Sequence, residues 1–480
     1  PGAASRHGPR GCAAAPRPPP WALPELALLE VLSWLGTEDL VARTAPVSVG
    51  WNTASRSREL WVSKLPHVRL HDRLLLVEKG IERRSRGKLF KCRQLGTGEA
   101  AVLRVLDLEM INAGQDDGVP TSFLREVAAL TRLSHPNIQR HFGAELLGRR
   151  ALTCTEFVHD SFTGWMKGLG EVPAGRRAAE IGDKFGQLLA GLAHAHSRGV
   201  IHRNLKPDNV FVDAGGVVKV GDFAASRSLE LPLGPCTPEN PKERERSGRE
   251  VRRLWYRAPE LILRTEVYGP EVDMWSAGCL LAEAATGKAA FPSEGEIDHL
   301  FQIFRLLGTP TTATWPEAVT MKHFSPKFPL YSGFDFEAAA RAACWGSAAD
   351  LGALQRQAEP DRGAVLENLL AIARAIGADG TRALSALLTP APARRPGAAA
   401  LLRAEAFFRA APSRAREARE AGGEASEAPR RPPPALDEKA AGVSAELAWS
   451  LLGFMQEQER LAPPAALPRA DPRAGPARGA

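Results

Sequence analysis

Residues 199–226, GVIHRNLKPDNVFVDAGGVVKVGDFAAS, constrain this chain more than any other stretch. They contain a polar loop, then two short apolar segments around Gly215-Gly216, and then Asp222. Two apolar segments joined by a glycine turn predict a β-hairpin, and this one carries Lys206, Asn209 and Asp222 at its ends. An ammonium, an amide and a carboxylate on one rigid support are suited to holding a metal ion and a polyphosphate.

Both ends of this stretch resemble motifs of protein kinases. HRNLKPDN is similar to their catalytic loop, H-R-D-L-K-x-x-N, and VGDFAAS is similar to their D-F-G segment. Asn204 stands where the family has its catalytic Asp, and Ala224 stands where it has glycine. The resemblance implies an α+β, bilobal fold with a mainly β small lobe and a mainly α large lobe. It also implies ATP and Mg²⁺ as cofactors, with Asn209 and Asp222 as metal ligands and Lys206 beside them.

The chain ahead of this domain has a different character. Residues 1–20 are rich in Pro, Ala, Gly and Arg, which predicts disorder. Residues 21–65 carry apolar positions at helical spacing, in the pattern LPE–L–LLEVL–WL–EDL–V–W–LW. A segment this short cannot bury all its apolar faces alone, so a partner or a neighbouring domain is expected to cover them.

That pattern resembles an F-box, a small all-α module that docks onto the Skp-type adaptor of cullin–RING ubiquitin ligases. The resemblance implies that the adaptor is contacted through five positions, namely Leu23, Pro24, Leu40, Trp51 and Trp61. The alternative is a helical extension that packs against the following domain.

Alternating polarity from about residue 74 to 108 predicts antiparallel strands, with a turn at residues 96–98. These strands resemble the start of a kinase small lobe, which is expected over about residues 74–155. The kinase glycine loop falls on Glu82, Arg84 and Gly87, so one of its three glycines is present. Glycine matters there because it lets backbone N–H groups approach phosphates closely. Arg104 replaces the phosphate-binding lysine of strand three, and a planar guanidinium is not equivalent to a compact ammonium.

The next segment, GVPTSFLREVAALTRLSHPNI, resembles the PSTAIRE helix of cyclin-dependent kinases. Its expected apolar side comprises Leu124, Val127, Ala128 and residues 130–133, and Glu126 is expected to pair with Arg104. In the family this helix binds a cyclin, so a cyclin-like partner is implied.

Residues 155–159 resemble the hinge between the lobes, whose backbone would face an adenine; the alternative is a plain connecting segment. Together with the residues above, the resemblance implies a nucleotide site made of Gly87, Val102, Arg104, Glu126, Glu156, Val158 and Phe211.

The large lobe, expected over about residues 160–409, continues the likeness to cyclin-dependent kinases in REVRRLWYRAPELIL and in IDHLFQIFRLLGTP. In that family Glu260 pairs with a late arginine, here Arg395. Arg252 and Arg253 replace an apolar residue and a threonine beside the substrate site, so a preference for proline-directed substrates does not carry over.

Three arginines, Arg125, Arg203 and Arg227, match the cluster that grips a phosphothreonine in the family. The threonine position aligns with Gly248. Either Ser247 carries the phosphate instead, or Glu250 neutralises the cluster without a phosphate. The favoured interpretation is a structural cluster that is not phosphorylated.

Two regions lie outside the family pattern. An alanine-rich stretch over about residues 338–382 predicts helices inserted in the large lobe. Residues 410–480 predict a mostly disordered tail, in which 445–461 is an amphipathic helix that either binds a partner or is idle.

Composition narrows the function further. The net charge of +7, from 62 basic and 55 acidic residues, calls for no nucleic-acid partner. The 6 cysteines form no CxxC pair, which favours a reducing compartment such as the cytoplasm or nucleus over disulfides or zinc. No apolar run approaches the roughly 20 residues of a membrane helix. The sequence starts at Pro1 rather than Met, which leaves open a targeting signal ahead of it.

Asn204 decides between two functions. An amide cannot accept a proton as a base, and losing a positioned base costs roughly 10²–10⁴ in rate. We therefore expect a domain that binds nucleotide weakly or not at all and recruits a protein substrate to a ubiquitin ligase. The alternatives are an active ATP-dependent serine/threonine kinase of the cyclin-dependent type, and a folded remnant with no selected role.

Overall fold

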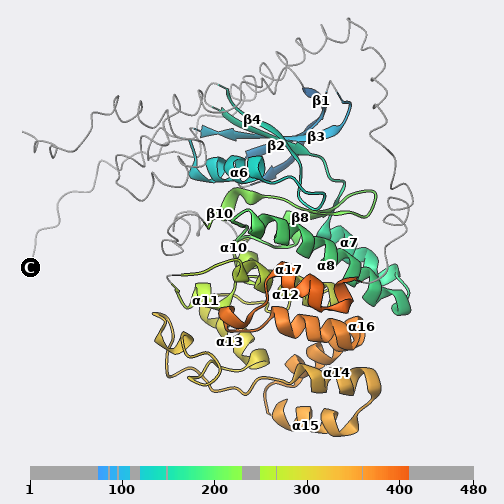
Figure 1. The fold of residues 1–480 in the computed structure, drawn as a ribbon, viewed down its shortest axis with the longest axis vertical. Coiled ribbons are helices and arrows are strands. Elements are labelled where there is room, and N and C mark those ends of the chain that lie inside the picture. The colour runs from blue at the N-terminus through green and yellow to red at the C-terminus, as the bar shows by residue number, and fades with distance from the viewer. Residues whose placement is uncertain are drawn as a thin grey trace, which may run out of the picture.

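The computed structural model describes residues 74–84, 87–94, 97–108, 119–147, 150–229, 249–265, 267–358 and 360–409 of the chain. They form a mainly β small lobe and a mainly helical large lobe (Figure 1). The bilobal α+β arrangement expected from the sequence is therefore present in the described residues.

The small lobe is built on an antiparallel sheet of five strands, in the order β1-β2-β3-β5-β4. The strands are β1 (Leu74–Arg84), β2 (Gly87–Gln94), β3 (Ala100–Asp107), β4 (His141–Leu147) and β5 (Arg150–Glu156). The chain reverses between β2 and β3, where Gly98 has a φ of +70° and its N–H donates to the Gln94 carbonyl at 2.8 Å. A small apolar core lines the sheet, formed by Phe90, Cys92, Ala101, Leu103, Val105, Leu152 and Cys154.

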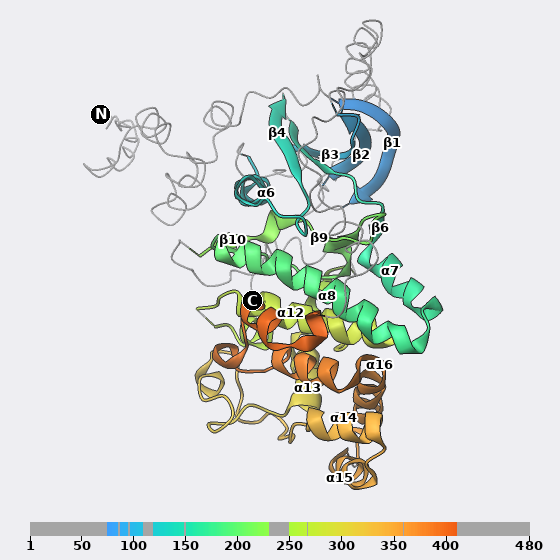
Figure 2. The ribbon, with the colours of Figure 1, turned by 45° about the vertical axis from the view of Figure 1, so that its right-hand side comes forward.

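Helix α6 (Thr121–Arg132) lies beside this sheet (Figure 2). Its buried residues Phe123, Leu124, Val127 and Leu130 recur every three or four positions, which gives a helix one apolar face. The expected apolar side was too wide, because Ala128 is only half-buried and Thr131 is exposed. The face that remains packs on the turn that follows the catalytic loop, at residues 223–225.

The large lobe is centred on α8 (Ala174–Ser197), α12 (Glu271–Thr286) and α16 (Gly363–Leu387), which pack on one another. Gly182 and Gly186 of α8 lie against the backbone carbonyls of Phe407 and Phe408, where a Cβ would collide. Glycine at these two positions lets the end of the described chain close over α8. Around these helices lie α7 (Phe162–Gly168), α10 (Arg249–Leu254), α11 (Pro259–Ile262), α13 (Glu296–Leu307), α14 (Phe336–Trp345), α15 (Ala348–Ala358) and α17 (Ala398–Ala404).

The predicted hairpin is present between the lobes. It consists of β8 (Val210–Val212) and β9 (Val218–Val220), and Gly216 adopts a φ of +76° in the turn. The Asp213 carboxylate accepts from the N–H groups of Gly215 and Val217, at 2.9 and 2.8 Å. Strand β6 (Asp160–Ser161) pairs with β8, and β7 (Val200–Ile201) pairs with β10 (Arg227–Ser228).

The alanine-rich stretch is helical, as predicted, and forms α14, α15 and α16. The last of these helices, α16, continues past residue 382 to Leu387 after a kink at Gly377. The buried residues Leu384 and Leu387 pack this last helix into the core of the lobe. Helix α16 is thus part of the core.

The predicted pair of Glu260 and Arg395 is also present, and both residues are buried. The two carboxylate oxygens of Glu260 lie 2.9 and 3.3 Å from the guanidinium nitrogens. The guanidinium also donates to the carbonyls of Glu271, Thr389 and Pro390. Every part of this buried charge therefore has a partner, which is the condition for burying it at all.

Several expectations fall outside the described residues. They are the disordered segment 1–20, the F-box of 21–65 with its five contact positions, Ser247 and Gly248, and the tail 410–480 with the helix at 445–461. Within the residues that are described, no helix combines the length and the apolarity needed to cross a membrane.

The Glu260–Arg395 pair gives a prediction about stability. Arg395→Met leaves the Glu260 carboxylate buried without its counter-charge, so we expect a loss of about 3–5 kcal/mol of unfolding free energy. Urea unfolding followed by circular dichroism measures it. The matched control is Arg394→Met, at an exposed neighbouring arginine, and equal stability of the two variants would contradict the role of the pair.

A second prediction concerns pH. His299 is fully buried, between the Ser293 hydroxyl and the Arg257 carbonyl, and its burial lowers the pKa to about 4. The unfolded chain titrates near 6.5, so the contribution of His299 to stability is complete above that pH and is lost as the pH falls toward 4.

Between pH 6.5 and pH 4 this loss of unfolding free energy amounts to up to about 3 kcal/mol. We expect His299→Phe to flatten the pH dependence of the unfolding free energy between pH 4 and 6.5, and His323→Gln, at an exposed histidine, to leave it as it is. Identical slopes for the wild type and His299→Phe would show the assignment to be wrong.

Candidate functional site

Asp273, a fully buried residue of α12, holds the catalytic loop, residues 202–209, in place. One carboxylate oxygen accepts from the N–H of His202 and the other from the N–H of Arg203, both at 2.8 Å. His196 lies 2.9 Å from the same carboxylate. Burial alone would raise the pKa of Asp273, but the hydrogen bond from the His196 side chain and the one from the His202 N–H hold that pKa below its usual range. The carboxylate thus stays ionised and fixes the loop.

This support compensates for local backbone strain. Arg203 has a φ of 65°, a conformation that costs a non-glycine residue free energy and persists only where neighbours impose it. The N–H bonded to Asp273 belongs to this same residue, so the strained turn and the buried acceptor occur together.

His202 connects the loop to the segment that carries Asp222. Its Nδ1 accepts from the N–H of Asn204 at 3.2 Å, so its Nε2 bears the proton and donates to the Gly221 carbonyl at 2.9 Å. The ring also packs edge-on against Phe223, with centroids 4.8 Å apart. The His202 side chain therefore ties the loop to Gly221, the residue that precedes Asp222.

Asp222 itself adopts a left-handed conformation, with a φ of 59°, and starts a short 3-10 turn over Phe223–Ala225. Phe223 is fully buried, and the turn packs against α6. Ala224 does not have a positive φ, so an alanine fits there without strain. The substitution of the family's glycine is compatible with this inward position of Phe223.

Asn209 is buried beside these residues. Its Nδ2 donates to the Asn204 carbonyl at 2.7 Å, which makes its Oδ1 the atom left to bind a metal. Lys206 forms an ion pair with Asp208 at 3.1 Å. Sequence analysis placed Lys206, Asn209 and Asp222 together, and the structure brings them to one end of the hairpin formed by β8 and β9.

Arg104 of β3 and Glu126 of α6 form the ion pair expected from the sequence. The Arg104 Nε also donates to the Thr153 hydroxyl at 3.3 Å. The arginine that replaces the family's lysine is thus engaged by α6 and by the neighbouring strand β5. This pair ties α6 to β3, and the turn that contains the buried Phe223 packs on α6.

A contact that the sequence did not reveal occupies the position of the catalytic base. Arg253 of α10 donates from its Nε to the Oδ1 of Asn204 at 3.3 Å. The sequence carried a signal, since an arginine replaces a threonine here, but not the partner. In this arrangement the side-chain oxygen of Asn204 is bonded to a cation of the chain itself.

The three arginines of the predicted phosphate cluster come from adjacent elements. Arg125 lies on α6, Arg203 on the catalytic loop, and Arg227 on β10, whose partner strand β7 leads into that loop. The Arg203 guanidinium donates to the Ala225 carbonyl at 3.3 Å and lies over the ring of Tyr268. The phosphate acceptor proposed from the sequence lies outside the described residues.

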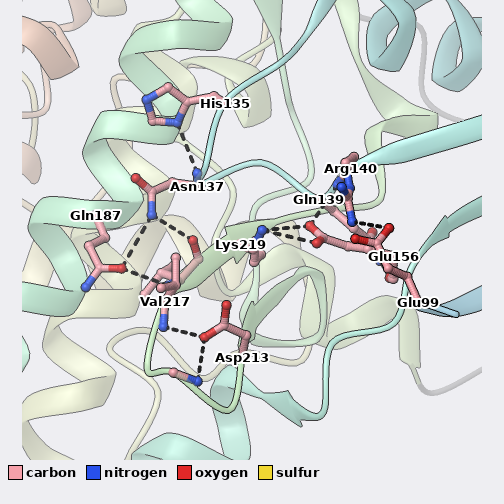
Figure 3. A network of polar contacts seen from close by, with 12 residues as sticks. Glu99, His135, Asn137, Gln139, Arg140, Glu156, Gln187, Asp213, Val217 and Lys219 are labelled. Atoms are coloured by element: carbon pink, nitrogen blue, oxygen red, sulfur yellow. Dashed lines mark hydrogen bonds and ion pairs between the residues drawn. The ribbon is translucent and has the colours of Figure 1, made fainter. Parts of the chain in front are cut away.

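At the hinge, Glu156 has more partners than the sequence suggested (Figure 3). Its carboxylate lies 2.9 Å from the Nζ of Lys219 and accepts from the Arg140 N–H at 2.9 Å. Its N–H donates to the Arg140 carbonyl, and its own carbonyl accepts from the Nε2 of Gln139, both at 2.9 Å. No sequence signal pointed to Gln139 or Lys219.

The remaining expected nucleotide residues lie on β2, β3, β8 and the segment after β5. Val102 pairs with Thr155 across β3 and β5, Val158 follows the hinge residue, and Phe211 is the middle residue of β8. Gly87 begins β2, and the side chains of Glu82 and Arg84 are outside the description.

The oxygen atoms of Asn209 and Asp222 are the kind of ligand that Mg²⁺ prefers. Among the described residues, no group of three or more His, Cys, Asp or Glu side chains could hold a metal ion. Asn209 and Asp222 are the residues that would hold a magnesium ion, which would supply positive charge to neutralise the phosphates.

The two lobes, the loop held by Asp273 and the inward Phe223 define a protein kinase architecture. A family model described as protein kinase domain matches residues 79–407, which is more than half of the chain. The chain belongs to the protein kinase family.

Proposed function

We propose that this kinase domain is of the cyclin-dependent type, transfers phosphate poorly, and serves to recruit a protein to a cullin–RING ubiquitin ligase through an F-box at residues 21–65. The observation that carries the proposal is the contact of Arg253 with Asn204. An amide in place of a carboxylate cannot take the proton of an attacking hydroxyl. Because its oxygen is already bonded to a guanidinium, it is also poorly placed to orient that hydroxyl.

The other substitutions act in the same direction. A planar arginine at position 104 holds Glu126 but does not reproduce the point charge of lysine on a phosphate. Glu82 and Arg84 stand in β1 where the family has glycine, which removes close backbone approach to the nucleotide. Since phosphoryl transfer relies on positioning and electrostatics, these changes together favour weak or absent nucleotide binding.

The F-box part of the proposal rests on the sequence pattern around Leu23, Pro24, Leu40, Trp51 and Trp61. A ligase receptor needs an adaptor-binding module and a surface that selects a protein, and an ordered kinase domain supplies such a surface. The likeness of α6 to the cyclin-binding helix makes a cyclin-like protein one candidate partner. The balanced charge and scattered cysteines agree with a place in the cytoplasm or nucleus.

A second candidate, an active serine/threonine kinase of the cyclin-dependent type, is favoured by a different observation. The Arg104–Glu126 pair is formed, Phe223 points inward, and Asn209 and Asp222 are retained. This is the arrangement that phosphoryl transfer requires of α6 and of the metal-binding segment.

The recruitment proposal predicts capture of a Skp-type adaptor by the full chain. We expect Leu40→Arg to weaken capture at least tenfold, because a charge would enter an apolar interface at a cost of several kcal/mol. Leu330→Arg is the matched control, since Leu330 is 81% exposed on the kinase domain. Capture that is absent in the wild type, or equal in the two variants, would refute an F-box.

The activity candidates are separated by a transfer assay with radiolabelled ATP, Mg²⁺ and a generic protein substrate. We expect the wild type to incorporate no more label than Asp222→Asn, which lacks a metal-binding carboxylate. Asn204→Asp alone should stay low, because Arg253 would pair with the new carboxylate. Asn204→Asp combined with Arg253→Thr should exceed it by roughly tenfold or more, since it frees a base.

Wild-type incorporation well above Asp222→Asn would instead establish the active kinase. Equal incorporation by the single and double variants would show that Arg253 does not restrain position 204.

A further inference from the structure

Gln139 lies in the segment that joins α6 to β4, and its side chain points at the hinge (Figure 3). Its Nε2 is 2.9 Å from the backbone oxygen of Glu156. A carbonyl oxygen can only accept, so the atom facing it must be the amide nitrogen, and the orientation of the amide is settled by chemistry. The hinge carbonyl thus already has a donor from the chain itself.

The same side chain fills space at the back of the cleft. Gly221, directly before Asp222, has no room for a Cβ because the Oε1 of Gln139 and the ring of Phe211 lie against it. Gln139 therefore occupies the volume bounded by the hinge carbonyl, the middle residue of β8 and the start of the metal-binding segment. These are the surroundings in which the base of a nucleotide is expected.

Both ends of this contact are fixed. The N–H of Gln139 donates to the Val220 carbonyl of β9 at 2.8 Å, so the backbone that carries the side chain is anchored. Glu156 is anchored by Arg140 on one side and by Lys219 on the other. Neither partner can shift to make room without breaking further bonds, so a ligand has to displace the Gln139 side chain.

We propose that Gln139 closes the base site by donating its amide to the hinge carbonyl, in the place where an exocyclic amino group such as that of adenine would donate. The inference rests on the proposed function in one respect, the weak binding of nucleotide, and supplies a cause for it that is separate from Asn204. The ligands disfavoured are heteroaromatic bases that offer an amino donor to the hinge.

The size of the effect follows from competition. A ligand that needs the open form binds more weakly by the fraction of the protein that is open. One internal hydrogen bond favours the closed form by up to about tenfold, and the bulk of the amide adds to it. Removing the amide should therefore strengthen adenine nucleotide binding by roughly tenfold or more.

The test compares the full chain with Gln139→Leu and Gln139→Ala, which lack the donor and differ in volume. Titration calorimetry and the shift of the melting temperature with ATP and Mg²⁺ report binding directly. The matched control is Gln187→Leu, because Gln187 is another partly buried glutamine of the same polar network, bonded to the Val218 N–H and not to the hinge. We expect at least one Gln139 variant to bind ATP roughly tenfold more tightly than the wild type, and Gln187→Leu to match the wild type.

Two results would overturn the inference. The first is wild-type affinity equal to that of both folded Gln139 variants; the second is no binding by either, which would place the obstruction elsewhere in the cleft. Neither result touches adaptor capture or the transfer assay, so recruitment would stand. Conversely, failed adaptor capture with tighter binding by Gln139→Leu would refute recruitment and retain the role of Gln139.

Discussion

The buried carboxylate of Asp273 accepts hydrogen bonds from two backbone N–H groups, and the positions of the other site residues depend on this interaction. Both carboxylate oxygens of Asp273 bind the catalytic loop. Because one of them accepts from the N–H of Arg203, that residue is held in a positive-φ conformation that it would otherwise avoid. The side chain of His202 in turn forms a hydrogen bond with the carbonyl of Gly221, which fixes the segment that starts at Asp222. Because Phe223 then packs on α6, a single buried charge in the large lobe bears on the position of a helix in the small lobe.

Three of the substitutions in this chain, at Asn204, Arg104 and Arg253, fall on side chains that would touch a nucleotide or a substrate. The groups that hold the backbone have kept their partners, as Asp273 and the Glu260–Arg395 pair show. Folding requires buried polar groups to be bonded, whereas transfer requires particular groups to be free for a ligand. The two demands concern different atoms, so one can be met without the other.

The hairpin and α6 could be predicted because turn residues and apolar periodicity specify them locally, and the Arg104–Glu126 and Glu260–Arg395 pairs were expected from the resemblance to protein kinases. The contacts of Gln139 and Arg253 could not be predicted, since each joins segments distant in the sequence through a side chain with several rotamers. The expected apolar side of α6 was too wide for a related reason. Whether Ala128 lies inward depends on the neighbouring elements, and periodicity does not contain that information.

The anchoring of Glu156 also governs how the lobes can turn against each other. As the last residue of β5 it is bonded to Arg140, and through Lys219 it is bonded to β9 in the large lobe. A rotation of the lobes about Glu156 would have to break its hydrogen bonds and its ion pair at the same time. Bending would then fall on residues 157–159, which lie between β5 and β6. The pivot between the lobes would thereby be displaced from Glu156 toward β6.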